Sequence, residues 1–361
     1  MLQQHRIYIV GFLGLFFTIN SAAQSFRNYS NEFLNIGVDA AALGLSKAVV
    51  ATSNDVNAVY WNPAGLVDLK DYQGAVMHAS YFAGIANYDF VAFAMPIDNR
   101  SALGVSVIRF GVDDILNTTE LIDSEGNINF NNISLFSAAD YAVTFSYARN
   151  LVVDELYIGG NAKIIRRIIG DFASSWGVGF DLGLQFQRGS WKLGIMARDI
   201  TTTFNTWSIN QAEFDKIKDA IPTENQLLPT TTELTKPKLQ IGAARKFKMG
   251  RFFHLVTEID ANIQFAKTND LLASNAISIA PAVGIQVDYD HLVFLRAGIG
   301  NMQYIQNYDE SQSLSVQPNF GIGFQYRGVQ IDYALTNIGS VGNALYSNIF
   351  SLKFDYQFFR H

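Results

Sequence analysis

Cysteine is absent from the 361-residue sequence, proline occurs only seven times, and charged residues make up 16% of the chain. Without cysteine, the protein has no disulfides, thiol nucleophiles or thiolate metal ligands. The formal charge of −6 argues against nucleic-acid binding, because phosphate contacts require a basic surface. Beyond the N-terminal residues, no stretch reaches the roughly 18 consecutive apolar residues of a membrane-spanning helix. The sequence therefore does not encode a helical membrane protein.

Hydrophobic residues nevertheless make up 49% of the sequence and aromatic residues 13%, with 28 phenylalanines, 16 tyrosines and 28 glycines. This composition is too apolar for a disordered chain, so the apolar residues must be dispersed over many short segments. Aromatic residues favour strands, and glycine fits the crowded interior of a barrel. The composition thus indicates an all-β protein.

Residues 1–23 have the pattern of a cleavable signal peptide. His5 and Arg6 precede an apolar stretch from Ile7 to Ile19, and Ser21-Ala22-Ala23 supplies the small residues of a cleavage site. The apolar stretch is too short for a comfortable transmembrane anchor. An exported chain without cysteine is typical of the bacterial envelope, since secreted eukaryotic domains usually contain disulfides. We therefore expect export in a Gram-negative bacterium.

From Asp71 onward, segments of the chain carry apolar side chains at every second position, which is the period of a two-faced strand. In the last segment, apolar Phe350, Leu352 and Phe354 alternate with polar residues. Fourteen such segments begin near Asp71, Ala86, Ser101, Leu135, Glu155, Ala173, Ser190, Lys236, Arg251, Ala276, His291, Ser315, Gly328 and Tyr346. This pattern predicts fourteen strands over residues 71–361.

The connections between these segments alternate in length. Even-numbered segments end in short turns such as Asp98-Asn99-Arg100, whereas most odd-numbered segments precede long polar connections such as Thr201 to Thr235. Short turns at one rim and long loops at the other are typical of an antiparallel outer-membrane β-barrel, with the turns and both termini in the periplasm. A soluble sandwich is the alternative, but its polar faces would carry more charge. We therefore predict a 14-stranded transmembrane barrel surrounded by outer-membrane lipid.

In such a barrel the polar face of each strand lines the lumen. The charged candidates for this lining carry both signs: Lys163, Arg167, Asp181, Arg198, Glu258, Asp260, Arg296, Asp332, Lys353 and Asp355. A barrel of fourteen strands is wide enough that its own side chains do not fill it. Residues 24–70 lack strand alternation and contain the turn Asn62-Pro63-Ala64-Gly65, where proline fixes φ and glycine permits a positive φ. We predict that residues 24–70 form a hatch, or plug, in the lumen.

The hatch segment also carries a family resemblance. The run from Ala42-Leu43-Gly44 through Asp55 to Tyr60-Trp61-Asn62-Pro63-Ala64-Gly65 resembles the PorV/PorQ family of outer-membrane proteins. That family is similar in fold to the FadL fatty-acid transporters, which carry an Asn-Pro-Ala turn in an N-terminal hatch. The resemblance marks Asp55, Tyr60, Trp61, Asn62, Pro63, Ala64 and Gly65 as the hatch motif. Leu45-Ser46-Lys47 departs from the family pattern, which usually has a second glycine and an apolar residue there.

The resemblance implies a non-catalytic role in the type IX secretion system of Bacteroidetes. The expected partners are the translocon barrel or attachment-complex proteins, and the C-terminal signal domains of exported cargo. The alternative is a FadL-like channel for hydrophobic small molecules, which needs an apolar pocket and a break in the wall. Pro281, inside the tenth predicted strand, could kink that strand and supply the break.

Few residues suggest a chemical site. The five histidines show no pair at metal-ligand spacing, so neither a metal nor a cofactor is expected. Glu258 and Asp260 lie two residues apart on one wall, as acid/base catalysis would need, but lumen polarity balanced by basic neighbours such as Arg296 is the favoured interpretation. No serine or threonine nucleophile with a nearby histidine can be identified, and we expect no enzymatic activity.

The connection from Thr201 to Thr235 is the most informative loop. Ser208 and Gln211 fit a helix capping box before a segment with a partly apolar face. The apolar residues proposed for partner binding are Ile209, Phe214, Ile217 and Ile221. This loop is interpreted either as a lid over its own barrel or as a surface for a translocon or cargo partner.

Overall fold

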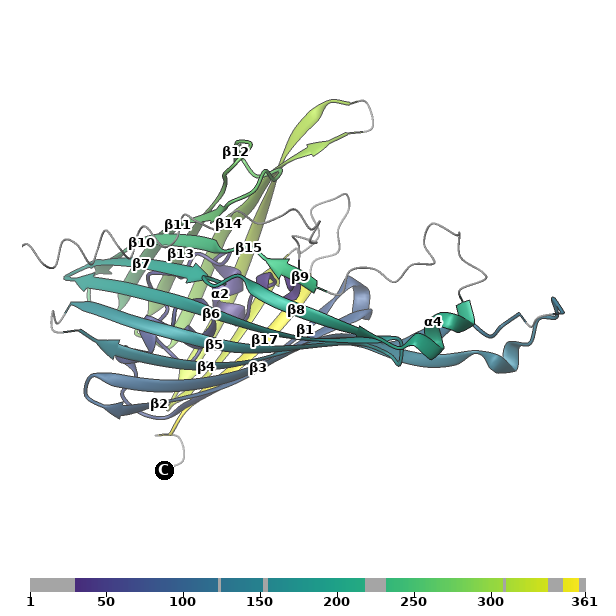
Figure 1. The fold of residues 1–361 in the computed structure, drawn as a ribbon. Coiled ribbons are helices and arrows are strands. Elements are labelled where there is room, and N and C mark those ends of the chain that lie inside the picture. Colours follow the sequence, from purple (N-terminus) through teal and green to yellow (C-terminus); the bar gives the residue numbers. More distant parts are fainter. Residues whose placement is uncertain are drawn as a thin grey trace, which may run out of the picture.

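The computed structural model describes residues 30–122, 125–151, 155–217, 232–307, 310–336 and 347–356. Its strands form one antiparallel sheet that closes into a barrel (Figure 1). Closure occurs because β1 (Gln73–Tyr81) pairs on one side with β2 (Ala86–Asp98) and on the other with β17 (Ser347–Asp355). The predicted signal peptide lies outside the described residues.

The wall contains the fourteen predicted strands, some of them divided. The remaining strands are β3 (Ser101–Asn117), β4 (Ser134–Asn150), β5 (Leu156–Ile169), β6 (Ala173–Arg188), β7 (Trp191–Arg198), β8 (Thr203–Ile209), β9 (Thr232–Thr235), β10 (Lys238–Met249), β11 (Phe253–Gln264), β12 (Leu272–Ala273), β13 (Ser278–Tyr289), β14 (Val293–Gln306), β15 (Gln312–Tyr326) and β16 (Val329–Thr336). β7 and β8 both pair with β6 and together make one strand of the wall. β9 and β10 make the next, and the short β12 pairs beside β13.

The side chains of each strand alternate between an exposed outer face and a buried inner face. In β17, Phe350 is 56% exposed whereas its neighbour Ser351 is 7% exposed. The same alternation places all ten predicted lumen residues on the inner face. No helix among the described residues is long and apolar enough to cross a membrane.

The strands extend unequally beyond the two rims. Short turns join the strands at the rim where β17 ends, which we call the short-turn rim. At the opposite, long-loop rim, the β3–β4 hairpin and the β14–β15 hairpin project well past the rest of the wall (Figure 1). The projecting ends carry the short helices η4 (Phe130–Asn132) and α4 (Gln211–Ile217).

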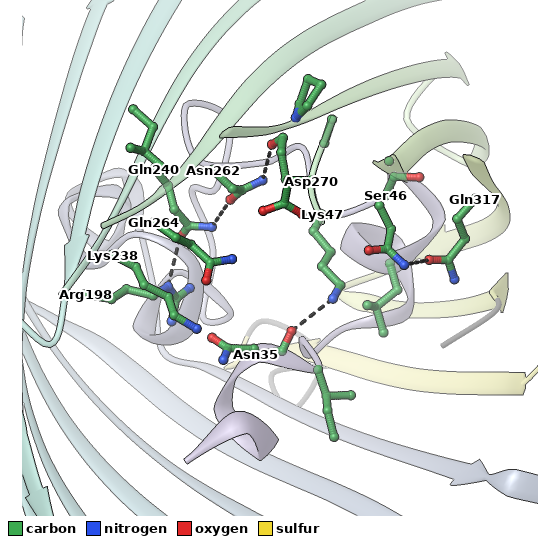
Figure 2. Close-up of a pocket in the computed structure, with 18 of the residues that line it drawn as sticks. Asn35, Ser46, Lys47, Arg198, Lys238, Gln240, Asn262, Gln264, Asp270 and Gln317 are labelled. Carbon is green, nitrogen blue, oxygen red and sulfur yellow. Dashed lines mark hydrogen bonds between the residues drawn. The ribbon is translucent and has the colours of Figure 1, made fainter. Parts of the chain in front are cut away.

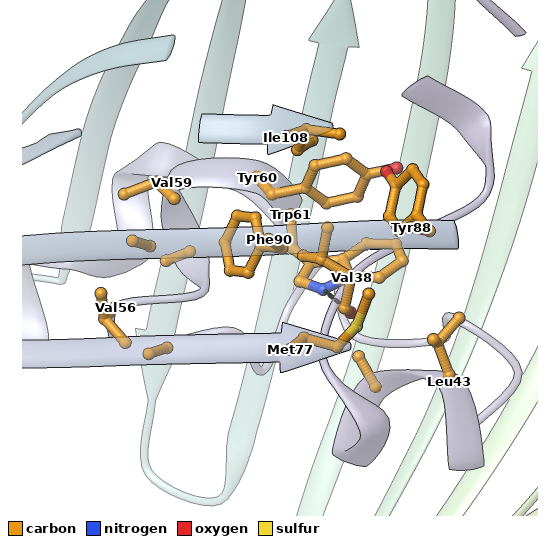
Figure 3. Packing of buried hydrophobic residues seen from close by; sticks show 14 of the residues in the cluster. Val38, Leu43, Val56, Val59, Tyr60, Trp61, Met77, Tyr88, Phe90 and Ile108 are labelled. Atoms are coloured by element: carbon orange, nitrogen blue, oxygen red, sulfur yellow. Dashed lines mark hydrogen bonds between the residues drawn. The ribbon is translucent and has the colours of Figure 1, made fainter. Parts of the chain in front are cut away.

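Residues 30–69, here called the N-terminal segment, pack against the inner wall. They contain η1 (Glu32–Asn35), α2 (Ala40–Gly44), α3 (Ala58–Trp61) and η2 (Pro63–Asp68), before the β1–β2 turn helix η3 (Phe82–Gly84). Val38 and Leu43 of this segment belong to one apolar cluster with Met77 and Phe90 of the wall (Figure 3). Such burial supplies most of the stability of helices this short, which are marginal in isolation.

Candidate functional site: the lumen and the N-terminal segment

The Asn-Pro-Ala-Gly turn is held against the wall through the side chain of Asn62. Its amide donates hydrogen bonds to the carbonyl oxygens of Val50 at 2.9 Å and of Leu184 in β6 at 3.1 Å. Its oxygen accepts a hydrogen bond from the Ala64 amide at 3.3 Å and so caps η2, which begins with Pro63. One fully buried asparagine therefore ties together the turn, the preceding loop and the barrel.

Glycine is required in this turn because its backbone lies very close to the backbone of the preceding loop. A Cβ atom at Gly65 would lie 1.9 Å from the carbonyl oxygen of Ser53. The wall also has a glycine where it contacts the turn: at Gly159 in β5, a Cβ atom would lie 2.4 Å from backbone atoms of Pro63 and Ala64. The turn thus seats directly on the wall, backbone against backbone.

The two aromatic residues before the turn fix the start of the N-terminal segment. The Tyr60 hydroxyl donates to the Leu34 carbonyl oxygen at 2.5 Å, and the Trp61 indole N–H donates to the Val38 carbonyl oxygen at 3.1 Å. The Arg198 guanidinium lies 4.6 Å from the centre of the Tyr60 ring and donates to the Tyr60 carbonyl oxygen at 2.9 Å. These contacts satisfy the polar atoms of two large buried side chains.

Carboxylates of the segment and the wall complete the attachment. Asp55 pairs with Lys353 of β17 at 2.6 Å. Glu258 accepts a hydrogen bond from the Ala51 amide at 2.6 Å, and Asp260 accepts from the Val49 amide at 3.1 Å. Arg296, the example predicted among their basic neighbours, forms an ion pair with neither carboxylate.

The Arg296 guanidinium instead pairs with Asp332 at 2.6 Å. Glu258 and Asp260 receive backbone N–H groups because residues 49–51 pass within hydrogen-bond distance of β11, which strand alternation alone does not reveal. Every residue predicted as the hatch motif from Asp55 to Gly65 thus lies at or next to a contact between the segment and the wall. Whether the segment closes the lumen stays a prediction.

A cavity of about 440 Å³ lies between the N-terminal segment and the long-loop rim. Lys47, Arg198 and Lys238 converge on it (Figure 2). Much of the remaining lining is amide-bearing, including Gln240, Asn262, Gln264, Gln303, Gln317 and Asn319. Burial lowers the pKa of Lys47 to about 8, and its ammonium donates to the Asn35 carbonyl oxygen at 2.9 Å. This lining suits a polar or anionic group better than an apolar molecule.

The N-terminal segment also contains a carboxyl group with an unusual pKa. Burial raises the pKa of Asp39 to about 7, with repulsion from Asp332 and Asp55 adding to the shift. Asp39 caps α2 by accepting from the Ala41 amide at 3.3 Å, and the Ser351 hydroxyl donates to it at 2.9 Å. Its ionisation is therefore coupled to the seating of the segment.

We expect the substitution Asp39→Asn to change the pH dependence of stability. Between the ordinary pKa of 3.8 and about 7, the folded protein holds a proton that the unfolded chain has released, so wild-type stability falls as pH rises through this window. The variant has no carboxyl group at this position and lacks this loss. The difference in free energy of unfolding, variant minus wild type, should therefore be about 1 to 3 kcal/mol more positive at pH 8 than at pH 4. Urea unfolding of both proteins in lipid vesicles at the two pH values measures the gain. A difference that does not vary with pH would contradict the prediction.

The two ends of the predicted loop over residues 201–235 belong to the wall, because they form β8 and β9. Ser208 lies in β8, opposite Ser174 of β6, so the predicted capping box is wrong. The Asn210 side chain instead caps α4 by accepting from the Ala212 amide at 3.1 Å. The helix lies beside the β3–β4 hairpin (Figure 1), where Lys216 pairs with Glu120 at 3.0 Å.

Two of the four apolar residues proposed for partner binding have described side chains. Ile209 ends β8 and is half-buried, Phe214 is half-buried in α4, and Ile217 ends that helix. Ile221 lies outside the described residues. Their role in binding a partner stays a prediction.

Sequence spacing also missed a cluster at the short-turn rim. His254 of β11, Asp288 of β13 and His291 of the β13–β14 turn bring three ligand-type atoms within 4.8 Å of one another. The signal that could have found it is strand register, since His254 and Asp288 are direct cross-strand neighbours.

Comparison with known proteins places the chain in a family. The family model for the type IX secretion system protein PorV matches residues 21–216, which is more than half of the 361 residues. No curated protein matches the sequence.

Among solved structures, the chain is similar to the CymD monoaromatic hydrocarbon channel, with 13% identity, a TM-score of 0.56, and coverage of 89% of this chain and 98% of that one. The Pseudomonas putida toluene transporter TodX matches with 12% identity, a TM-score of 0.51 and coverage of 89% and 99%. The Ralstonia pickettii toluene transporter TbuX matches with 12% identity, a TM-score of 0.50 and coverage of 88% and 98%. At these identities the likeness concerns the fold, a FadL-like outer-membrane barrel. The family match and the fold agree with the sequence-based prediction, and the chain belongs to the PorV family of type IX secretion system proteins.

Proposed function

We propose that this protein acts without catalysis, binding a type IX translocon barrel or attachment-complex protein through its outer wall and the signal domains of exported cargo at its long-loop rim. Membership of the PorV family supports the assignment to the type IX secretion system. The observation that carries the finer assignment is a charged cluster on the outer face of β1, β2 and β3.

This outer-wall cluster consists of His78, Asp89, Arg109 and Asp113. His78 lies 2.7 Å from Asp89, and Arg109 lies 2.9 Å from Asp113 and 3.9 Å from Asp89. The four side chains are between 28% and 61% exposed. Exposed Val91 and Phe93 share their face of the wall, whereas residues of the opposite parity, such as Met77 and Phe90, are buried against the N-terminal segment.

The cluster lies in the half of the wall nearer the long-loop rim. His78 is the sixth of the nine residues of β1, a length that just spans a bilayer core, and its cross-strand neighbour Asp89 is the fourth residue of β2. An arginine facing lipid costs about 2–4 kcal/mol at the bilayer midplane and less toward the interface. The cluster contains two carboxylates and one guanidinium, so it is complementary to a membrane protein that presents basic or hydrogen-bond-donating side chains.

The long-loop rim supports the cargo part of the proposal. The β3–β4 hairpin projects beyond the wall and exposes Leu116, Ile122, Ile128 and Phe130 to between 60% and 72%. Exposed apolar side chains gathered on one projecting element are typical of a protein-binding surface. A folded β-rich domain could pack against this hairpin and the neighbouring α4.

The alternative function, a channel for hydrophobic molecules, has one observation in its favour. Pairing between β13 and β14 ends at Val283, two residues beyond Pro281. The β11–β13 loop occupies the gap between these strands. The Leu271 backbone amide donates to the Met302 carbonyl oxygen at 2.9 Å, and the Tyr304 backbone amide donates to the Asn269 carbonyl oxygen at 2.8 Å. Together with the polar cavity, this favours the binding role over hydrocarbon passage.

We expect replacement of all four cluster residues by leucine to abolish recovery of the translocon barrel. The variant should still fold, since leucine suits a lipid-facing wall, while co-purification from detergent extract falls at least about tenfold. The matched control is Arg245→Leu, which removes another outward guanidinium, placed over Trp191. Quantitative immunoblotting of the translocon barrel gives the measurement, and wild-type recovery with the four-leucine variant would refute the wall interface.

A further inference from the structure

The histidine–carboxylate cluster at the short-turn rim is separate from the N-terminal segment and from the outer-wall cluster. The Nδ1 atoms of His254 and His291 lie 3.1 Å and 3.0 Å from the same Asp288 oxygen, Oδ1. The His291 amide also donates to this oxygen at 3.2 Å. The two imidazole rings are stacked with centroids 4.5 Å apart. Two segments that are distant in sequence, β11 and the end of β13 with its following turn, thus direct two nitrogen donors and one oxygen donor to one point.

The charge on Asp288 has an unusual set of partners. Its carboxylate side chain is only 4% exposed, and its ion-pair partners among the described residues are the two histidines. Asp332, another buried lumen carboxylate, pairs instead with the permanent cation of Arg296. A divalent cation held by both imidazoles would give this buried carboxylate of Asp288 a further electrostatic partner.

We propose that His254, Asp288 and His291 bind a divalent transition-metal ion of the zinc class. Imidazole nitrogen and carboxylate oxygen are donors that such ions accept. An ion about 2.1 Å from each donor holds the donors about 3 to 3.5 Å apart, which agrees with the two nitrogen–oxygen distances. Each ring must turn out of the stack for its Nδ1 lone pair to point at the ion.

The cluster is open to solvent on one side. The His291 side chain is 67% exposed, and the three residues line a cavity of about 800 Å³ on the short-turn side of the N-terminal segment. Three protein ligands leave a fourth position for water or for a donor from a partner on the side expected to face the periplasm. The ion would tie β11 and β13 to the turn that leads into β14.

The test is zinc binding to the full chain purified in detergent with an affinity tag that contains no histidine. Calorimetric titration of the chelator-treated protein with Zn²⁺ should show one saturable site. His254→Gln and His291→Gln should each weaken binding at least about tenfold, because each removes one of three ligands. The matched control is His78→Gln, since His78 also contacts an aspartate, at 2.7 Å, but has no second histidine in its cluster.

A thermal-shift measurement guards against misfolded variants. Without Zn²⁺, the two cluster variants should unfold at temperatures similar to that of the wild type. Zn²⁺ should raise the unfolding temperature of the wild type and of the His78→Gln protein, but not that of the two cluster variants. No saturable binding to the folded wild type would overturn the proposal. Equal affinity of the wild type and the His254→Gln and His291→Gln variants would overturn it as well.

Discussion

Replacing Gly159 with valine is expected to unseat the N-terminal segment and to open an ion-conducting path through the barrel. A Cβ atom at this position would lie 2.4 Å from backbone atoms of Pro63 and Ala64, and a backbone cannot rotate away as a side chain can. Overpacking of this kind costs about 1–3 kcal/mol. Such a cost shifts the ratio of unseated to seated segment by about 5- to 150-fold.

The adjacent glycine offers a matched control. A Cβ atom at Gly160 would meet only the Asp181 carbonyl oxygen, at an ordinary distance of 3.6 Å, so Gly160→Val should behave as the wild type. Single-channel recording in planar bilayers and limited proteolysis of residues 30–69 measure the two consequences. Equal protection in both valine variants would show that the Gly159 contact does not hold the segment in place, and lost protection without added conductance in Gly159→Val would show that the segment does not close the lumen.

The barrel wall could be predicted from sequence because its two faces meet different solvents. Lipid selects apolar side chains on one face and the filled lumen tolerates polar ones on the other, so the period of two persists across the strands. The prediction failed where a strand is interrupted. The chain turns between Asp199 and Thr202, both at positive φ, and β8 then resumes the pairing with β6 inside what the sequence indicated as a loop.

Which lumen charges pair with which could not be predicted from alternation. Asp55 and Lys353 are 298 positions apart in sequence and meet only after the barrel closes. The partners of Glu258 and Asp260 are backbone amides, which no pattern of side chains identifies. The turn residues Asn62 to Gly65 were recognised from their local chemistry and family resemblance, whereas the cross-barrel contacts that use them depend on the folded register.

Replacing Lys163 with methionine is expected to destabilise the barrel strongly. The Lys163 ammonium is 6% exposed and lies 2.7 Å from Asp181 and 2.6 Å from Asp199. Both aspartates are buried, and Asp199 holds the turn that separates β7 from β8. Removing the ammonium leaves two buried carboxylates without their shared cation, which costs about 3–5 kcal/mol.

Lys216 provides the comparison that isolates burial from pairing. It also bridges two carboxylates, those of Glu120 and Glu213, each at 3.0 Å, but its side chain is 44% exposed. Lys216→Met should therefore change the free energy of unfolding by less than about 1 kcal/mol, because water screens and replaces exposed ion pairs. Urea unfolding in lipid vesicles, followed by tryptophan fluorescence, measures both variants. Adding Asp199→Asn to Lys163→Met should recover part of the lost stability, since one of the two unpaired carboxylates is then removed. Equal effects of the two lysine substitutions would mean that water reaches Lys163 and that the lumen there is not filled.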